Sequence, residues 1–121
     1  MNADTSALIR ATIFVRDLDR ATAFYRAVGF SDTYLDTVLD HPSASRLLGF
    51  RVHEPYPVRI LKQPGPAFGM VGLFQLGRAQ GAETMTPATG AVRIGEVALV
   101  FYVRSLDETL ARVRAAGPLW L

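Results

Sequence analysis

Two stretches of the chain show the same change from a strand pattern to a helix pattern. Residues 8–15 are mostly apolar and rich in β-branched side chains, and apolar residues then recur at helical spacing up to Gly29. Residues 96–103 and the stretch that follows them, up to Gly117, repeat this pattern. From Ala11 to Gly29, eight of nineteen residues are identical to those 88 positions later, far more than unrelated segments share. The chain therefore contains an internal duplication of one strand–helix unit.

Both predicted helices carry end signals. Asp17 is placed to cap the first helix, and Ser105 and Glu108 form a capping box at the start of the second. Gly29 and Gly117 supply the left-handed residue that commonly ends a helix. A strand–helix unit needs residues of these types for structural reasons, so the repetition indicates a repeated fold unit and does not by itself indicate a function.

The chain between the two units alternates between element and turn signals. A strand is predicted at 30–36, a short helix at 41–50, and two further strands at 58–63 and 68–76. Residues 78–94 are rich in Gly, Ala and Thr, which predicts a linker. The predicted order is strand, helix, strand, short helix, strand, strand, linker, strand and helix.

Composition and charge narrow the class of protein. The chain has 121 residues, half of them apolar, and a formal net charge of only +2, which indicates one globular domain. It contains no block of like charges, so neither nucleic acid nor a membrane surface is predicted as a partner. The absence of cysteine excludes disulfides and thiolate chemistry. The start of the chain lacks a signal-peptide pattern and no apolar run could span a membrane, so a cytoplasmic location is predicted.

The first unit, "FVRDLDRATAFYRAVGF", resembles the opening of a βαβββ module of the vicinal oxygen chelate superfamily. That superfamily includes glyoxalase I, bleomycin-resistance proteins and extradiol dioxygenases. The later stretch "YVRSLDETLARVRAAG" resembles the start of its second module. The resemblance implies an α+β fold of paired βαβββ modules, whose curved sheets enclose a cleft. It implies a first module at 1–77 with an inserted short helix, a linker at 78–94 and a second module at 95–121.

The second module stops after its predicted strand and helix, with only "PLWL" remaining. Three more strands with their turns would need roughly thirty residues. The sequence therefore predicts either a truncated product or a sheet that a partner chain completes. A strand with unpaired edges promotes association. We therefore expect a homodimer that buries the strand at 96–103 or the helix that follows it.

The resemblance also implies where a metal would be held. The ligand positions correspond to Arg10 on the first strand, Gln75 on the fourth and Ala98 on the repeated strand. Arginine is always protonated, alanine has no donor atom, and one glutamine cannot hold a divalent ion. No metal cofactor is therefore predicted. The alternative is a divalent metal held by other residues, among them His41 and His53. The sequence otherwise predicts that His41 lies in a loop or at a helix start and that His53 lies in a surface loop.

Strand alternation predicts which side chains face the cleft. Ile9, Ala11, Ile13 and Val15 form an apolar face that should pack on the helix, which leaves the alternate residues of that strand for the cleft. Each candidate also has a structural interpretation: Arg10 could pair with Glu96, Gln75 could bond within the sheet, and Phe14 and Tyr102 could fill a core. The candidate ligand-binding residues are Arg10, Thr12, Phe14, Leu73, Gln75, Glu96 and Tyr102.

These residues would line a cavity with one cation, one carboxylate, an amide, a hydroxyl and two aromatic rings. Such a lining suits a small, partly apolar ligand with a polar group. The sequence therefore predicts a metal-independent small-molecule-binding protein of the glyoxalase or bleomycin-resistance type. The alternatives are a metal-dependent glyoxalase-like lyase or isomerase, an extradiol-type dioxygenase, or an inactive truncated product. No catalytic residue is identified.

Overall fold

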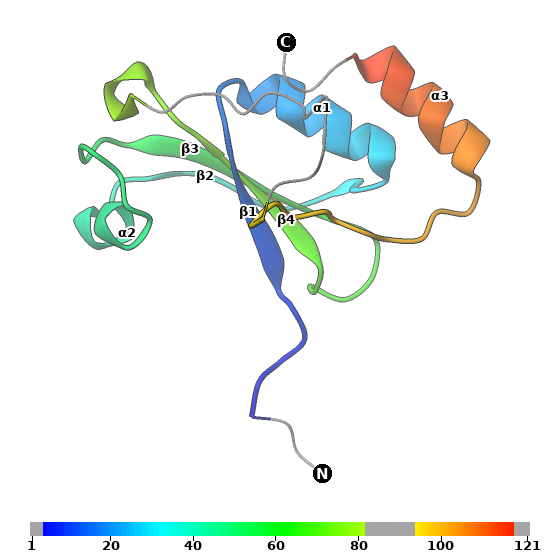
Figure 1. The fold of residues 1–121 in the computed structure, drawn as a ribbon, viewed down its shortest axis with the longest axis horizontal. Helices are drawn as coiled ribbons and strands as arrows, with labels where there is room; N and C mark the ends of the chain where they lie inside the picture. The colour runs from blue at the N-terminus through cyan, green and yellow to red at the C-terminus, as the bar shows by residue number, and fades with distance from the viewer. Residues whose placement is uncertain (1–3, 82–93, 118–121) are drawn as a thin grey trace.

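A computed structural model describes residues 4–81 and 94–117, and it has the predicted α+β class. One four-stranded mixed sheet forms its centre, with α1 and α3 on one side and α2 on the other (Figure 1). Pairing of this sheet with a second βαβββ module remains a prediction. The elements are β1 (Arg10–Val15), α1 (Leu18–Val28), β2 (Asp32–Leu39), α2 (Pro42–Leu47), β3 (Tyr56–Lys62), β4 (Met70–Gln75), the 3-10 turn η1 (Arg78–Gln80) and α3 (Leu106–Ala116).

The strand order is β1-β4-β3-β2, so β1 and β2 are the edges of the sheet. β1 pairs with β4 in parallel, and the other two pairings are antiparallel. The parallel register sets Ile13 beside Leu73 and Phe14 beside Phe74. Because side chains alternate along a strand, this register assigns each residue of β4 to the same face as its β1 partner.

The sheet separates two apolar cores. On the face that α1 covers, here called the α1 face, Leu18, Ala21, Tyr25 and Phe30 pack on Leu61, Val71 and Leu73. Ile13 and Val15 pack against this core, as the alternation of β1 predicts. On the opposite face, here called the second face, the core consists of Tyr56, Val58, Ile60, Met70 and Phe74, with Leu48 and Phe50 packed against it from the segment after α2.

The ends of α1 are fixed by polar contacts. The Asp17 side chain accepts a hydrogen bond from Arg20 N at 3.0 Å, which confirms the predicted cap. Gln75 Oε1 accepts a second bond from Leu18 N at 2.9 Å. Gly29 ends the helix with a φ of 136°, and its N–H bonds to the carbonyls of the last turn. These contacts anchor α1 to the sheet as well as to the preceding loop.

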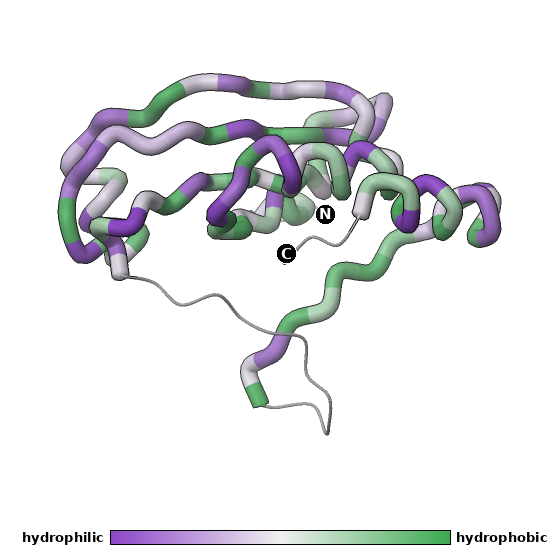
Figure 2. Tube along the Cα trace, turned by 90° about the horizontal axis from the view of Figure 1, so that it is seen from above, coloured by the Kyte–Doolittle hydropathy of each residue, from purple (hydrophilic) through white to green (hydrophobic). Residues whose placement is uncertain are grey.

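The predicted strand at 96–103 is wrong within the part of the chain that the structure describes. Residues 94–105 contain no strand, and Figure 2 shows residues 94–100 as a largely apolar segment apart from the sheet. A strand needs a neighbour to satisfy its backbone groups, and this segment pairs with none of the described strands. The apolar pattern alone could not supply that neighbour.

The helix predicted after this segment is present and packs on α1. Ser105 caps α3 by accepting from Glu108 N at 3.2 Å, as the capping-box pattern predicts. Arg112 Nε donates to Ala27 O at 3.0 Å, and the rings of Phe101 and Phe30 meet edge to face with centroids 5.6 Å apart. The second unit is therefore held to the first through α3 and through Phe101 in the segment before it.

Two further predictions concern the linker and the membrane. The predicted linker at 78–94 begins with the 3-10 turn η1, and its residues 82–93 lie outside the described residues. Residues 118–121, the end of the predicted second module, also lie outside them. Among the described helices, none has the length and apolar character needed to span a membrane.

Candidate ligand-binding site

The predicted residues of β1 do share one face. Arg10, Thr12 and Phe14 project from the second face and are more exposed than the alternate residues of the strand. The Arg10 side chain lies across Gly72 of β4, where a Cβ would come 3.3 Å from Arg10 Cδ and 3.3 Å from Phe74 Cε1. A glycine within a strand often marks such a close approach. Gly72 thus leaves the space in which the Arg10 side chain lies flat on the sheet.

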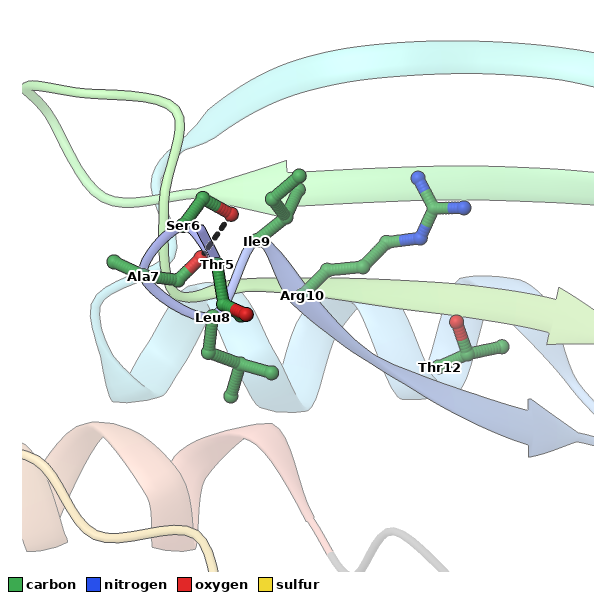
Figure 3. A pocket seen from close by; sticks show the side chains of 7 residues that line it. All are labelled: Thr5, Ser6, Ala7, Leu8, Ile9, Arg10 and Thr12. Atoms are coloured by element: carbon green, nitrogen blue, oxygen red, sulfur yellow. Dashed lines mark hydrogen bonds between the residues drawn. The ribbon is translucent and has the colours of Figure 1, made fainter. Parts of the chain in front are cut away.

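A surface hollow of about 490 Å³ opens beside Arg10. Figure 3 shows the Arg10 guanidinium on the side of the hollow away from Ser6 and Ala7. Ser6 Oγ donates a hydrogen bond to the Ala7 carbonyl at 2.9 Å. Within residues 4–81 and 94–117, the Arg10 guanidinium makes no hydrogen bond or ion pair. The hollow is lined by Thr5, Ser6, Ala7, Leu8, Ile9, Arg10 and Thr12.

Phe14 lies at the other end of β1 and contacts two rings. Its centroid is 5.8 Å from that of Phe50 and 6.1 Å from that of Phe74, both edge to face. It is nevertheless partly exposed, and it lines a second hollow between Leu76 and the segment after α2. Phe14 therefore both supports the core of the second face and presents a ring to solvent.

Two residues that were predicted to face the cleft project instead from the α1 face. Leu73 is fully buried in the core of the α1 face, and Gln75 turns to the same side to bond Leu18 N. The parallel register causes this, because it aligns Leu73 with Ile13 and Gln75 with Val15. A shift of one residue in the assumed facing exchanges the two faces of a strand. The β4 residues that lie beside Arg10, Thr12 and Phe14 are Met70, Gly72 and Phe74.

Glu96 and Tyr102 do not join the β1 residues. Both belong to the segment that forms no strand, and Tyr102 is fully exposed. The salt bridges of the described residues do not include the predicted pair between Arg10 and Glu96. The structure thus assembles Arg10, Thr12 and Phe14 into one surface and leaves these two outside it.

The three positions that the resemblance gave for a metal do not converge. Arg10 projects from the second face, Gln75 projects from the α1 face, and Ala98 belongs to none of the described strands. Within residues 4–81 and 94–117, no group of three or more potential metal-ligating side chains is found. A divalent ion held by other residues remains the alternative that the sequence left open.

Sequence reasoning missed a hydrogen-bonded chain beside α2. His53 Nε2 lies 2.9 Å from Asp40 Oδ1, and His53 Nδ1 lies 2.8 Å from Ser45 Oγ. A carboxylate only accepts, so Nε2 donates to Asp40, and the Nδ1 of a neutral ring accepts from Ser45. Ser45 is buried, so the chain fixes the loop before β3 to α2 and does not present a nucleophile to solvent. The residues are up to thirteen positions apart, and their spacing carries no motif.

Burial affects two tyrosines. Loss of solvent raises the pKa of both Tyr25 and Tyr56 above the usual value for a phenol. The Tyr56 hydroxyl is buried in the core of the second face, and among the described residues it has no hydrogen-bond partner. We therefore expect that removal of this hydroxyl would not destabilise the core.

The family resemblance rests on the residues alone. Comparison with family models, with curated proteins and with solved structures finds no match to this chain. The fold therefore stands as an α+β domain with one mixed four-stranded sheet, and the superfamily remains a prediction.

Proposed function

We propose that the chain is a small-molecule-binding protein of the glyoxalase or bleomycin-resistance type, with its ligand held at Arg10 on the second face. One observation supports the proposal above the others. The Arg10 side chain crosses Gly72 beside a hollow of about 490 Å³, and its guanidinium makes no hydrogen bond or ion pair with the described residues. An arginine in this setting is available to a ligand from solution.

The chemistry of the hollow selects the ligand class. A guanidinium keeps its charge at every physiological pH and bonds carboxylates through two parallel N–H groups. The hydroxyls of Thr5 and Thr12 add polar contacts, while Leu8 and Ile9 supply apolar wall. The ligand is therefore a small, partly apolar compound that carries a carboxylate or a carbonyl group.

A second copy of the chain is part of the proposal. Residues 96–103 repeat the apolar strand pattern of residues 8–15, yet they have no strand partner among the described residues. Ile94, Val97, Val100 and Tyr102 are almost fully exposed, which is unusual for so many apolar side chains in succession. A homodimer would bury these side chains and could complete a sheet across the two subunits. A cytoplasmic location is also part of the proposal.

The test compares Arg10→Ala with Arg114→Ala, which removes an exposed arginine from the far helix α3. Pyruvate is the probe because it carries both a carboxylate and a carbonyl group, and binding is followed by chemical-shift titration. Arg10→Ala should weaken binding by roughly 10- to 100-fold, the effect of losing a hydrogen bond to a charged group. Equal affinity of the two variants would make Arg10 a structural residue and end the proposal.

The metal-dependent alternative has its own test. Elemental analysis of the purified protein should find well under one zinc, nickel, iron or manganese per chain. A stoichiometric ion would favour the lyase, isomerase or dioxygenase interpretation, with ligands other than the three positions that the resemblance gave. An intact mass below that of the full reading frame would favour the truncated product.

A further inference from the structure

The second hollow has the composition of a separate binding site. It has a volume of about 300 Å³, and it lies between the C-terminal end of β1, the segment after α2, and η1. Neither Arg10 nor Thr12 lines it, so it is distinct from the site of the proposed function. We propose that it binds an aromatic carboxylate. The lining residues are Phe14, Leu48, Gly49, Phe50, Arg51, Leu76 and Gln80.

The apolar part of the hollow is formed by two aromatic rings and two leucines. Phe14 and Phe50 meet edge to face with centroids 5.8 Å apart, and Leu48 and Leu76 complete the wall. The Phe50 ring is also held against buried Tyr56, with centroids 4.9 Å apart. Aromatic rings prefer edge-to-face and offset contacts with one another. A flat ring is therefore the shape that this wall accommodates best.

The charged part of the hollow is Arg51. Its guanidinium lies against the backbone of Gly81, where a Cβ would come only 2.8 Å from one terminal nitrogen. Gly81 also has a φ of 64°, a conformation that glycine adopts without strain. Among the described residues no carboxylate forms a salt bridge with Arg51. Arg51 thus lines the same hollow as the aromatic rings, and its guanidinium is available to an anion.

The loop that carries Phe50 and Arg51 is held from two sides. The buried Gln80 side chain accepts from Arg51 N at 2.9 Å and donates to Val52 O at 2.8 Å. Its amide also donates to Glu54 Oε1 at 3.2 Å, so this nearby carboxylate is engaged by Gln80 and does not line the hollow. The bonds of His53 to Ser45 and Asp40 fix the other side of the loop. A site held in place before binding loses less entropy when the ligand arrives.

Size and polarity together define the ligand. The volume lies at the lower end of small-molecule sites, which suits one ring or two fused rings. The single cation at the edge of an apolar wall calls for one anionic group, and Arg51 can bond a carboxylate through two N–H groups. A neutral aromatic compound would leave that interaction unused, and an aliphatic carboxylate would lose the ring contacts.

The first experiment titrates the full chain with benzoate and with benzyl alcohol, which has the ring without the charge, and follows backbone amide shifts. We expect saturable shifts at Gly49, Phe50, Arg51 and Gly81, with a dissociation constant on the order of millimolar. Benzyl alcohol should bind at least about 10-fold more weakly. Equal affinity of the two compounds, or shifts confined to Arg10 and Thr12, would overturn the proposal.

The second experiment changes the cation. Arg51→Gln should weaken benzoate binding by roughly 10- to 100-fold, whereas Arg46→Gln, an exposed arginine on α2, should leave it unchanged. Arg10→Ala should also leave it unchanged, which separates this site from the one of the proposed function. Gly81→Ala places a methyl group where the guanidinium lies and should weaken binding as well. Unaltered affinity in Arg51→Gln would refute the assignment.

Discussion

The contact between Gln75 and α1 offers the sharpest test of which face of the sheet each β4 side chain projects from. Gln75 Oε1 accepts from Leu18 N at 2.9 Å across 57 positions of the chain. Leu18 is the first residue of α1, and its side chain is buried in the core of the α1 face. The Asp17 side chain already serves Arg20 N, so it does not replace the lost acceptor. Gln75→Ala therefore leaves a partly buried N–H group without its partner.

The size of the effect follows from that loss. Removing one partner of a partly buried hydrogen bond costs about 1–3 kcal/mol of unfolding free energy. For a domain of this length, that corresponds to a fall in Tm of roughly 3–15 °C. Gln75→Glu restores an acceptor and adds a negative charge at a helix N-terminus, where it is favourable. That variant should match the wild type within about 0.5 kcal/mol at neutral pH.

Urea unfolding followed by far-UV circular dichroism measures these differences. Gln63→Ala is the matched control, because Gln63 is exposed and lies in the turn after β3. The stability of Gln75→Glu should fall as the pH drops below about 4.3, where a glutamate carboxylate takes up a proton and the interaction is lost. The sign follows because the folded state favours the charged form.

Two results would refute the reasoning. If Gln75→Ala were as stable as Gln63→Ala, the hydrogen bond to α1 would not contribute to stability. If Gln75→Glu bound one divalent ion per chain, the side chain would project from the second face, as the resemblance implied. The structure predicts neither outcome, because the register of β1 and β4 fixes Gln75 beside Val15.

Three further predictions concern the two cores and the exposed segment. Leu73→Ala should lower the unfolding free energy by about 2–5 kcal/mol, whereas Leu47→Ala on exposed α2 should change it by less than about 0.5 kcal/mol in the same urea assay. Tyr56→Phe removes a buried hydroxyl without a described partner, so the unfolding free energy should stay equal or rise by about 1 kcal/mol. Burial raises the pKa of Tyr56, so the wild type should lose stability above about pH 10, and this loss should be smaller in Tyr56→Phe. Light scattering at micromolar concentration should give a dimer for the wild type and a smaller mass for Val100→Asp, and a monomeric wild type would contradict this.

The sequence predicted the facing of β1 and missed that of β4 for a physical reason. β1 alternates between partly buried and exposed positions, so its pattern distinguishes the two faces. The first five residues of β4 are all buried, because that strand is central and has a core on each side. A strand with two apolar faces carries no alternation to read. Its facing had to come from the register with β1, which is a long-range property.

The contacts of the second hollow were beyond sequence reasoning for a related cause. Gln80 bonds to residues 26–29 positions earlier. His53 joins Asp40, which follows β2, to Ser45 of α2, and these residues have no motif spacing. Gly72, Gly77 and Gly81 did leave a trace in the sequence, as glycines at positions where a side chain approaches the backbone. The caps of both long helices were readable because they depend on residues within four positions of one another.

The duplication allows the burial of the two repeated helices to be compared position by position. Leu106 occupies the position in α3 that Leu18 occupies in α1, yet Leu106 is 64% exposed and Leu18 only 6%. Leu110 is 38% exposed, and its counterpart Thr22 is 7% exposed. The two helices have the same length and equivalent caps, so local sequence does not account for this difference. α1 buries its face on β3 and β4, whereas α3 contacts α1 and none of the described strands to a similar extent. Among the described residues, α3 has no sheet of its own to pack on. The proposed homodimer would supply one, because the apolar segment before α3 has the composition of a strand.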